Sequence, residues 1–216
     1  MTIDKDDLLN SIMESLDRVQ HIKLEDIPNI DLYMDQVTTF MESKLKSTVR
    51  NPGEDKILTK TMINNYAKND LLPPPVKKKY SKEHVLMLIF IYYYKGILSI
   101  NDIQTLLKPI SEKYFHSEGD LNLGVIYEEI FGLEKMQVDA LKNDILNKFE
   151  TSRKPFKDAP EEDREFLQLF SFIGLLSFDV YIKKLLIEKM VDALGSASSE
   201  DEKDKSNSKA KKNPVN

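Results

Sequence analysis

Three consecutive prolines at positions 73–75 constrain this chain more than any other feature, because the sequence around them is patterned for helices nearly throughout. Each proline lacks an N–H donor and pushes the residue before it towards extended geometry. The stretch LLPPPVKKKY (71–80) therefore cannot be helical. It predicts a stiff, extended connection between one helix that ends near residue 69 and another that begins near residue 82.

Elsewhere, apolar residues recur at a spacing of three to four, which predicts an all-α fold. The predicted helices cover residues 4–22, 32–46, 60–69, 82–95, 100–107, 123–131, 134–149 and 161–194. Side chains that can cap a helix N terminus are expected at four of these starts: Asp31, Thr59, Ser81 and Ser99. Pro109 follows the helix predicted over 100–107.

The most apolar segment is FLQLFSFIGLLSF (166–178). A membrane-spanning helix needs about 20 apolar residues. This run is shorter, and Asp179, Lys183 and Lys184 follow it. The pattern therefore predicts a buried helix and no membrane contact. From residue 195 onward Val215 is the one large apolar side chain. Such a segment cannot bury enough surface to fold, so residues 195–216 are predicted to be a disordered tail.

Several classes of chemistry have no support in the sequence. The chain has no cysteine, which excludes disulfides and thiolate sites and fits a reducing compartment. Its first ten residues are acidic rather than basic and apolar, so no secretory signal is expected and a cytoplasmic location is predicted. The three histidines are isolated, and no phosphate loop, serine elbow or zinc-protease motif is present. We therefore predict no metal site, no cofactor and no enzyme activity.

Charge is unevenly distributed. The chain has a net charge of −5, yet residues 56–95 hold eight lysines and two acidic residues, a local charge of +6. A basic block in an acidic protein is typical of a site for an anionic partner, most often nucleic acid. The alternative is that these lysines collect on a solvated face without a partner.

The helix predicted over 60–69 arranges its polar residues in a stripe. Residues Lys60, Asn64 and Lys68 are spaced four apart and share one side, with Thr61 and Asn65 beside them. Asparagine can pair with adenine in the major groove through two hydrogen bonds, and lysine can neutralise phosphate. The prolines would then hold a basic wing beside this helix, formed by Lys77, Lys78 and Lys79, with Tyr80 as its anchor. The pattern predicts a winged helix-turn-helix that binds double-stranded DNA.

Residues 58–107 resemble the DNA-binding domain of the mercury-resistance-regulator (MerR) family. The resemblance rests on six features, which are the cap Thr59, the core residue Ile63, Tyr66, the exit LLPP (71–74), the wing end KYS (79–81) and the helix start LSI (98–100). Where that family usually has Arg-Tyr, this chain has Asn64 and Asn65, and its wing is shorter. The whole chain also resembles a bacterial family catalogued only as a domain of unknown function.

Four regions are expected. They are an N-terminal helix (1–27), the MerR-like winged helix-turn-helix (28–108), a C-terminal helical region (109–194) and the tail (195–216). The resemblance implies a DNA-binding transcriptional regulator, whose C-terminal helices would form a homodimer or sense a partner or ligand. The alternative is a protein-interaction adaptor that keeps the fold without binding DNA. The sequence identifies neither an operator nor a small-molecule effector.

Overall fold

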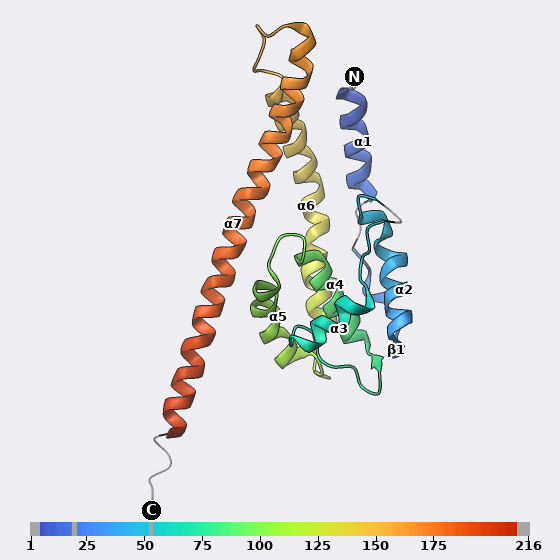
Figure 1. Ribbon diagram of the computed structural model, residues 1–216, viewed down its shortest axis with the longest axis vertical. Coiled ribbons are helices and arrows are strands. Elements are labelled where there is room, and N and C mark those ends of the chain that lie inside the picture. Colours follow the sequence, from blue (N-terminus) through green and yellow to red (C-terminus); the bar gives the residue numbers. More distant parts are fainter. Residues whose placement is uncertain (1–4, 19–20, 52–53, 211–216) are drawn as a thin grey trace, which may run out of the picture.

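The computed structural model describes residues 5–18, 21–51 and 54–210, which are mostly helical and contain one two-stranded sheet (Figure 1). The predominance of helix predicted from the sequence is confirmed. The helices are α1 (Lys5–Arg18), α2 (Met34–Leu45), α3 (Lys60–Lys68), α4 (Lys82–Tyr94), α5 (Ile100–Tyr114), α6 (Leu123–Ser152) and α7 (Glu161–Ala210). Two 3₁₀ helices, η1 (Leu24–Asp26) and η2 (Lys46–Thr48), flank α2, and the strands are β1 (Leu32–Tyr33) and β2 (Lys79–Tyr80).

Most of the hydrophobic core lies around α4, within a part of the chain that we call the body (residues 21–51 and 54–130). The residues at 85–91 of α4 are all buried, on every side of the helix. A helix that is apolar all round is stable only when other elements surround it. Here α2, α3, α5 and the first half of α6 supply that cover, through buried side chains such as Met41, Ile63, Ile103 and Tyr127.

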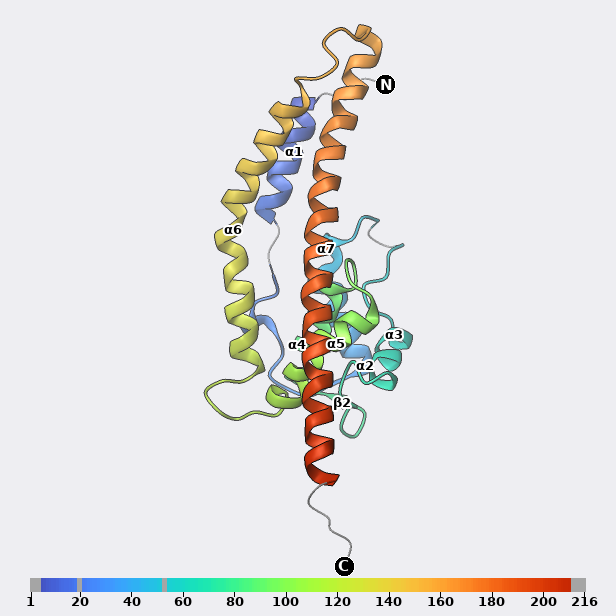
Figure 2. The same cartoon turned by 90° about the vertical axis from the view of Figure 1, so that its left-hand side faces the viewer.

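A second, smaller core lies in what we call the arm (α1 with residues 131–186). Ile145, Phe149 and Phe172 are buried there, and the Phe149 and Phe172 rings pack edge to face with centroids 5.4 Å apart. The apolar face of α1 covers them. Figure 2 shows α1, α6 and α7 running alongside one another at this end of the molecule. The two long helices are also joined by an ion pair, in which Lys148 Nζ of α6 lies 2.8 Å from Asp179 Oδ2 of α7.

Several predicted boundaries are wrong. The helix expected over 32–46 begins at Met34, because Leu32 and Tyr33 pair with β2 instead. Its N-terminal cap is Tyr33 rather than Asp31, and the Tyr33 N–H donates to the Gln36 side chain at 2.8 Å. In the first predicted helix, residues 4 and 19–20 lie outside the described residues, while 21–22 are not helical.

Two expected helix breaks are also absent. Helix α5 continues through Pro109 to Tyr114, because Leu107 and Ile110 on either side of the proline pack against the body core. Helix α6 is continuous where two helices were predicted. Phe131 packs on the body core at the predicted gap, and Gly132 faces open space, so the helix has no steric reason to end there.

The last helix differs most from expectation. It continues to Ala210, where a disordered tail from residue 195 was predicted, and residues 211–216 lie outside the described residues. Much of its apolar segment is exposed rather than buried. The exposed large apolar side chains of α7 are Phe166, Phe170, Ile173, Phe178, Val180, Tyr181, Leu185, Leu186, Met190 and Leu194. Among the described residues, no helix has both the length and the apolar character needed to cross a membrane.

The exposure of α7 follows from how few elements touch it. Its first half packs on α6 through one side, which includes Phe172 and Leu176. Its second half packs on the body through Ile187 and Val191. At Gly195 the backbone comes so close to α5 that an added Cβ would lie 3.4 Å from the Thr105 methyl group. The ten exposed apolar side chains of α7 lie between or beside these contacts.

Candidate nucleic-acid interface

Helix α3 presents a polar face because its two apolar anchors fix its rotation. Ile63 and Tyr66 are buried in the body core, as the sequence predicts for them. Thr59 caps the helix as predicted, since its hydroxyl accepts the Met62 N–H at 3.1 Å. The structure places the five predicted contact residues of α3 on the outside, where all are exposed: Lys60, Thr61, Asn64, Asn65 and Lys68.

The chain leaves α3 through a tight turn that leads into the proline segment. Asp70 adopts a left-handed conformation with φ of 54°. The N–H groups of Leu71 and Leu72 then both donate to the Tyr66 carbonyl, at 2.9 and 3.2 Å. Both leucines are buried. The three prolines therefore start from a fixed point next to the C terminus of α3.

After the prolines the chain makes a two-residue β-hairpin. Val76 and Lys79 exchange two backbone hydrogen bonds of 3.1 and 2.9 Å, and Lys77 and Lys78 form the turn with φ of 50° and 65°. A turn with two positive φ values is normally made by Asn-Gly or a similar pair. Each residue with a Cβ in this conformation costs roughly 1–2 kcal/mol. The sequence predicts a basic wing here but gives no turn signal, because the usual glycine is missing.

The returning side of this hairpin is anchored to the body. Strand β2 pairs antiparallel with β1, so that Tyr80 lies opposite Leu32 and Lys79 opposite Tyr33. Tyr80 is buried, which raises the pKa of its hydroxyl and agrees with its predicted role as an anchor. The Lys79 amine lies 5.4 Å from the centroid of the Tyr33 ring, within range of a cation–π contact.

Sequence reasoning gave no role to His84, but this residue fixes the base of the hairpin. Its Nδ1 accepts the Ser81 N–H at 2.9 Å, and its Nε2 lies 3.4 Å from the Pro74 carbonyl. Burial lowers the pKa of His84, so the ring is neutral and its Nε2–H can donate to that carbonyl. The only signal in the sequence was its place three residues after a capping serine, where glutamate or glutamine is usual.

The charges around α3 and the hairpin are mostly basic. Lys60 forms an ion pair with Asp35, which stands in the first turn of α2. In the described part of the chain, no acidic residue of α6 or α7 pairs with the lysines of α3 or the hairpin. Figure 2 shows α3 and the hairpin next to each other, on the side of the molecule away from α6. Seven of the eight predicted residues are exposed and Lys79 is half-buried, and we call these residues of α3 and the hairpin the basic face.

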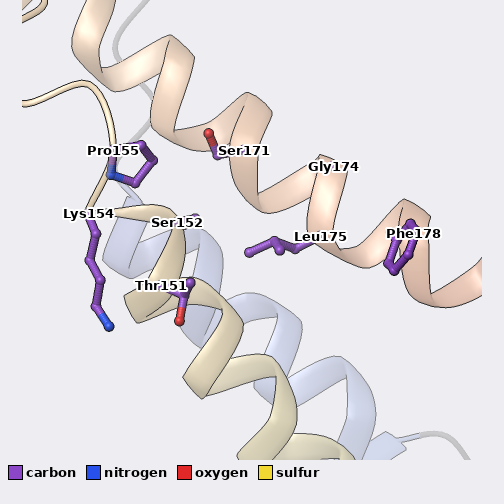
Figure 3. A pocket seen from close by; sticks show the side chains of 8 residues that line it. All are labelled: Thr151, Ser152, Lys154, Pro155, Ser171, Gly174, Leu175 and Phe178. Atoms are coloured by element: carbon purple, nitrogen blue, oxygen red, sulfur yellow. The ribbon is translucent and has the colours of Figure 1, made fainter.

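A different kind of hollow lies at the far end of the arm, where a groove of about 620 Å³ runs between α6 and α7 (Figure 3). Its two serine hydroxyls are already used, because Ser152 and Ser171 donate to the Phe149 and Leu167 carbonyls. Figure 3 shows Leu175 between the two helices and Lys154 extending away from α7. The groove therefore offers apolar surface and no converging polar groups. No three His, Asp or Glu side chains gather as metal ligands anywhere in the described residues.

One comparison with known proteins gives a result. Residues 22–130, just over half of the chain, match the family model described as "Domain of unknown function (DUF1836)". The match covers the body with its basic face, while the arm lies outside it. No curated protein matches the chain, and no solved structure does.

Proposed function

We propose that this chain, which belongs to the DUF1836 family, binds double-stranded DNA and regulates transcription in the cytoplasm. In this proposal α2, α3 and the hairpin form a MerR-like winged helix-turn-helix. The observation that carries it is the basic face itself. A short helix with a polar outer side stands beside a rigid hairpin that holds two lysines in a strained turn.

Helix α3 is the element that we assign to the major groove. Its outward Asn64 and Asn65 would read base edges, because an amide side chain can both donate to and accept from adenine. Lys60 and Lys68 lie at the two ends of the helix and would contact phosphates on either side of the groove. Thr61 would add a hydroxyl contact. Ile63 and Tyr66 hold this face outward by their burial.

The hairpin is assigned to the phosphate backbone. Lys77 and Lys78 occupy its tip and are exposed, while Lys79 lies at its base against Tyr33. Strained backbone persists in proteins where the surrounding structure enforces it, and it concentrates at functional sites. An Asn-Gly turn would relieve the strain but would remove both charges. Lysines at these two strained positions therefore favour an anionic partner over a purely structural turn.

A second copy of the chain is the proposed partner of α7. Phe166, Phe170, Ile173 and Val180 recur at spacings of four, three and seven and lie on one side of the helix. The buried Phe172 lies about a third of a turn away from that side. This spacing is that of a coiled-coil seam, and an exposed apolar stripe of this length marks an interaction site. A dimer with two-fold symmetry would present two basic faces to two half-sites of an operator.

The adaptor function is the second candidate, and one observation favours it. Lys60 is already paired with Asp35, so one of the proposed phosphate contacts has an internal partner. The remaining lysines of the basic face could equally receive an acidic protein. The two functions differ in what Asn64 and Asn65 do. DNA recognition needs their amide groups to bind base edges, whereas binding of an acidic protein needs only the lysine charges.

Selection of bound sequences from a random DNA pool, followed by fluorescence anisotropy, tests the proposal. In the variant with Asn64→Ala and Asn65→Ala, the preferred site should lose affinity, by about 1–3 kcal/mol for each base that is no longer read, while non-specific binding is kept. In the variant with Lys77→Ala, Lys78→Ala and Lys79→Ala, all sequences should weaken together. Matched exposed residues on the arm, Lys183→Ala and Lys184→Ala, provide a control that should bind as the parent does. Equal binding of all variants would support the adaptor instead.

A further inference from the structure

A second cavity, of about 320 Å³, lies in the body at the C-terminal end of α4. This volume is near the lower end of the range for small-molecule sites, roughly 300–1,000 Å³. Three segments supply its walls, which are the end of η2, the segment before α3, and the last turn of α4 with the two residues that follow it. The lining residues include Thr48, Lys56, Tyr92, Tyr93, Lys95 and Gly96.

The polar side of this cavity is positively charged. Lys95 is partly buried, and burial lowers its pKa from the usual value for lysine. Its amine donates to the Ile57 carbonyl at 2.6 Å, and in the described residues no carboxylate pairs with it. Lys56 lines the same cavity and likewise has no ion-pair partner in the described part of the chain. A lysine ammonium that loses hydration without gaining a counter-ion is stabilised when an anion binds to it.

The other side of the cavity is aromatic. The Tyr92 and Tyr93 rings pack edge to face, with centroids 5.6 Å apart and planes at 75°. The Lys95 amine lies 4.7 Å from the centroid of the Tyr92 ring, and the Tyr92 hydroxyl is held by Thr48. At Gly96 no other atom lies within 4 Å of the position that a Cβ would take, so the end of the cavity is open. The walls therefore suit a flat apolar body joined to a single negative group.

The cavity is connected to α3 by one hydrogen bond. Ile57, whose carbonyl accepts from Lys95, stands two residues before Thr59, the cap of α3. Ile57 and Leu58 are buried, so this short segment is fixed in the core. An anion that draws the Lys95 amine toward the cavity would compete with the Ile57 carbonyl for its protons. Such competition would act on the residues that set the position of α3.

We propose that this cavity binds a small aromatic carboxylate of about the size of benzoate, with Lys95 and Lys56 on the carboxylate and the two tyrosines on the ring. Binding would alter the position of α3, and this second step rests on the proposed DNA-binding function. The cavity would then serve as an effector site for a regulator.

Titration of the ¹⁵N-labelled full chain with benzoate, followed by NMR, tests the first step directly. The Gly96 and Lys95 amides should shift on binding. Benzamide, which has the same shape without the charge, should bind at least about tenfold more weakly, as expected for the loss of a charge-assisted hydrogen bond. Lys95→Gln should weaken benzoate by a similar factor, and Lys56→Gln should weaken it less. Lys113→Gln is the matched control, since the Lys113 amine also lies over a tyrosine ring, at 5.0 Å, but lines no part of the cavity.

The results separate the two steps. Equal binding of benzoate and benzamide, or unchanged binding in Lys56→Gln, overturns the carboxylate site, and the second variant keeps the test valid if Lys95→Gln does not fold. For the coupling, benzoate should change DNA affinity in the parent and not in Lys95→Gln. A chain that binds benzoate as described but binds no DNA keeps the cavity and loses the regulator. A chain that binds DNA but not benzoate loses only the cavity.

Discussion

Two apolar runs of this chain look alike in sequence but differ in how much of their surface is buried. Residues 85–91 of α4 are all buried, because helices of the body surround α4. Residues 166–178 of α7 are also mostly apolar, but Phe166 and Phe170 are 66% and 61% exposed. The difference in burial lies mainly in the neighbours of each run. The body buries its own apolar surface, whereas the arm leaves an apolar stripe exposed that a partner can cover.

The comparison also separates two roles. The body carries the basic face on a framework of buried side chains, so the positions of Asn64 and Lys68 are fixed by the core beneath them. The arm has a small core and a long exposed side, which suits assembly better than recognition. In the proposed function the body recognises DNA and the arm forms the dimer. Substitutions in each region test that division.

The largest effect is expected from a tyrosine in the body. Tyr66 is 6% exposed, and Tyr66→Ala should lower the free energy of unfolding by about 3–5 kcal/mol, as for other core aromatics. Tyr181 on α7 is 62% exposed, and Tyr181→Ala should change it by only about 0.5 kcal/mol or less. Urea denaturation at low protein concentration measures both. Similar losses in the two variants would mean that the arm is as fully packed as the body.

The next effect concerns assembly rather than folding. Replacing Phe166 and Phe170 by serine should weaken the proposed dimer by about 2 kcal/mol or more, because large apolar residues at the centre of an interface carry most of its energy. Analytical ultracentrifugation of parent and variant gives the dissociation constants. Phe156→Ser is the control, since Phe156 is also exposed but lies in the loop between α6 and α7. A parent that is monomeric at tens of micromolar contradicts the proposed role of the arm.

A pH effect should be confined to the body. Burial lowers the pKa of His84 in the folded protein, so the unfolded chain binds this proton more readily. The stability that depends on neutral His84 is therefore complete above pH 6.5, and it is lost as the pH falls from there through the folded-state pKa. Denaturation curves between pH 7.5 and pH 5 should show this loss in the parent and a shallower one in His84→Gln. Identical slopes in both proteins would show that His84 is not the group responsible.

The smallest effect is expected from the end of α7. Removing residues 196–216 should leave the melting temperature within experimental error, because Val191 is the last residue of α7 described as buried and the close approach at Gly195 is kept. Differential scanning calorimetry makes this comparison. A fall of several degrees would show that the helical extension beyond Gly195 docks on the protein.

Local patterns predicted the parts of the fold that local physics decides. Thr59 caps α3, Tyr66 is buried and the proline segment is not helical, and each follows from a few neighbouring residues. The wrong predictions fall where contacts between residues distant in sequence determine the local structure. Pro109 lies inside a helix because the residues on either side of it pack against the core. Strand β1 replaces the start of a predicted helix because β2 pairs with it.

The candidate site divides in the same way. The exposed stripe on α3 could be predicted, since helical spacing fixes which side chains share a face. The turn at Lys77 and Lys78 could not, because the residues that adopt positive φ there are not those that favour it. The role of His84 depends on the Pro74 carbonyl ten residues earlier, and no local pattern predicts that pairing.

The turn at the tip of the hairpin allows the most direct test of the central claim, that the basic face binds DNA. The double variant with Lys77→Asn and Lys78→Gly keeps the turn, relieves its strain and removes its charge. It should be more stable than the parent by about 1 kcal/mol or more. Its DNA affinity, measured by anisotropy from 50 to 200 mM salt, should fall, and the log–log salt slope should flatten by about 0.9 for each phosphate that is no longer neutralised. A more stable variant that binds DNA with the affinity and salt slope of the parent would contradict the account, as would a parent that binds no DNA at 50 mM salt.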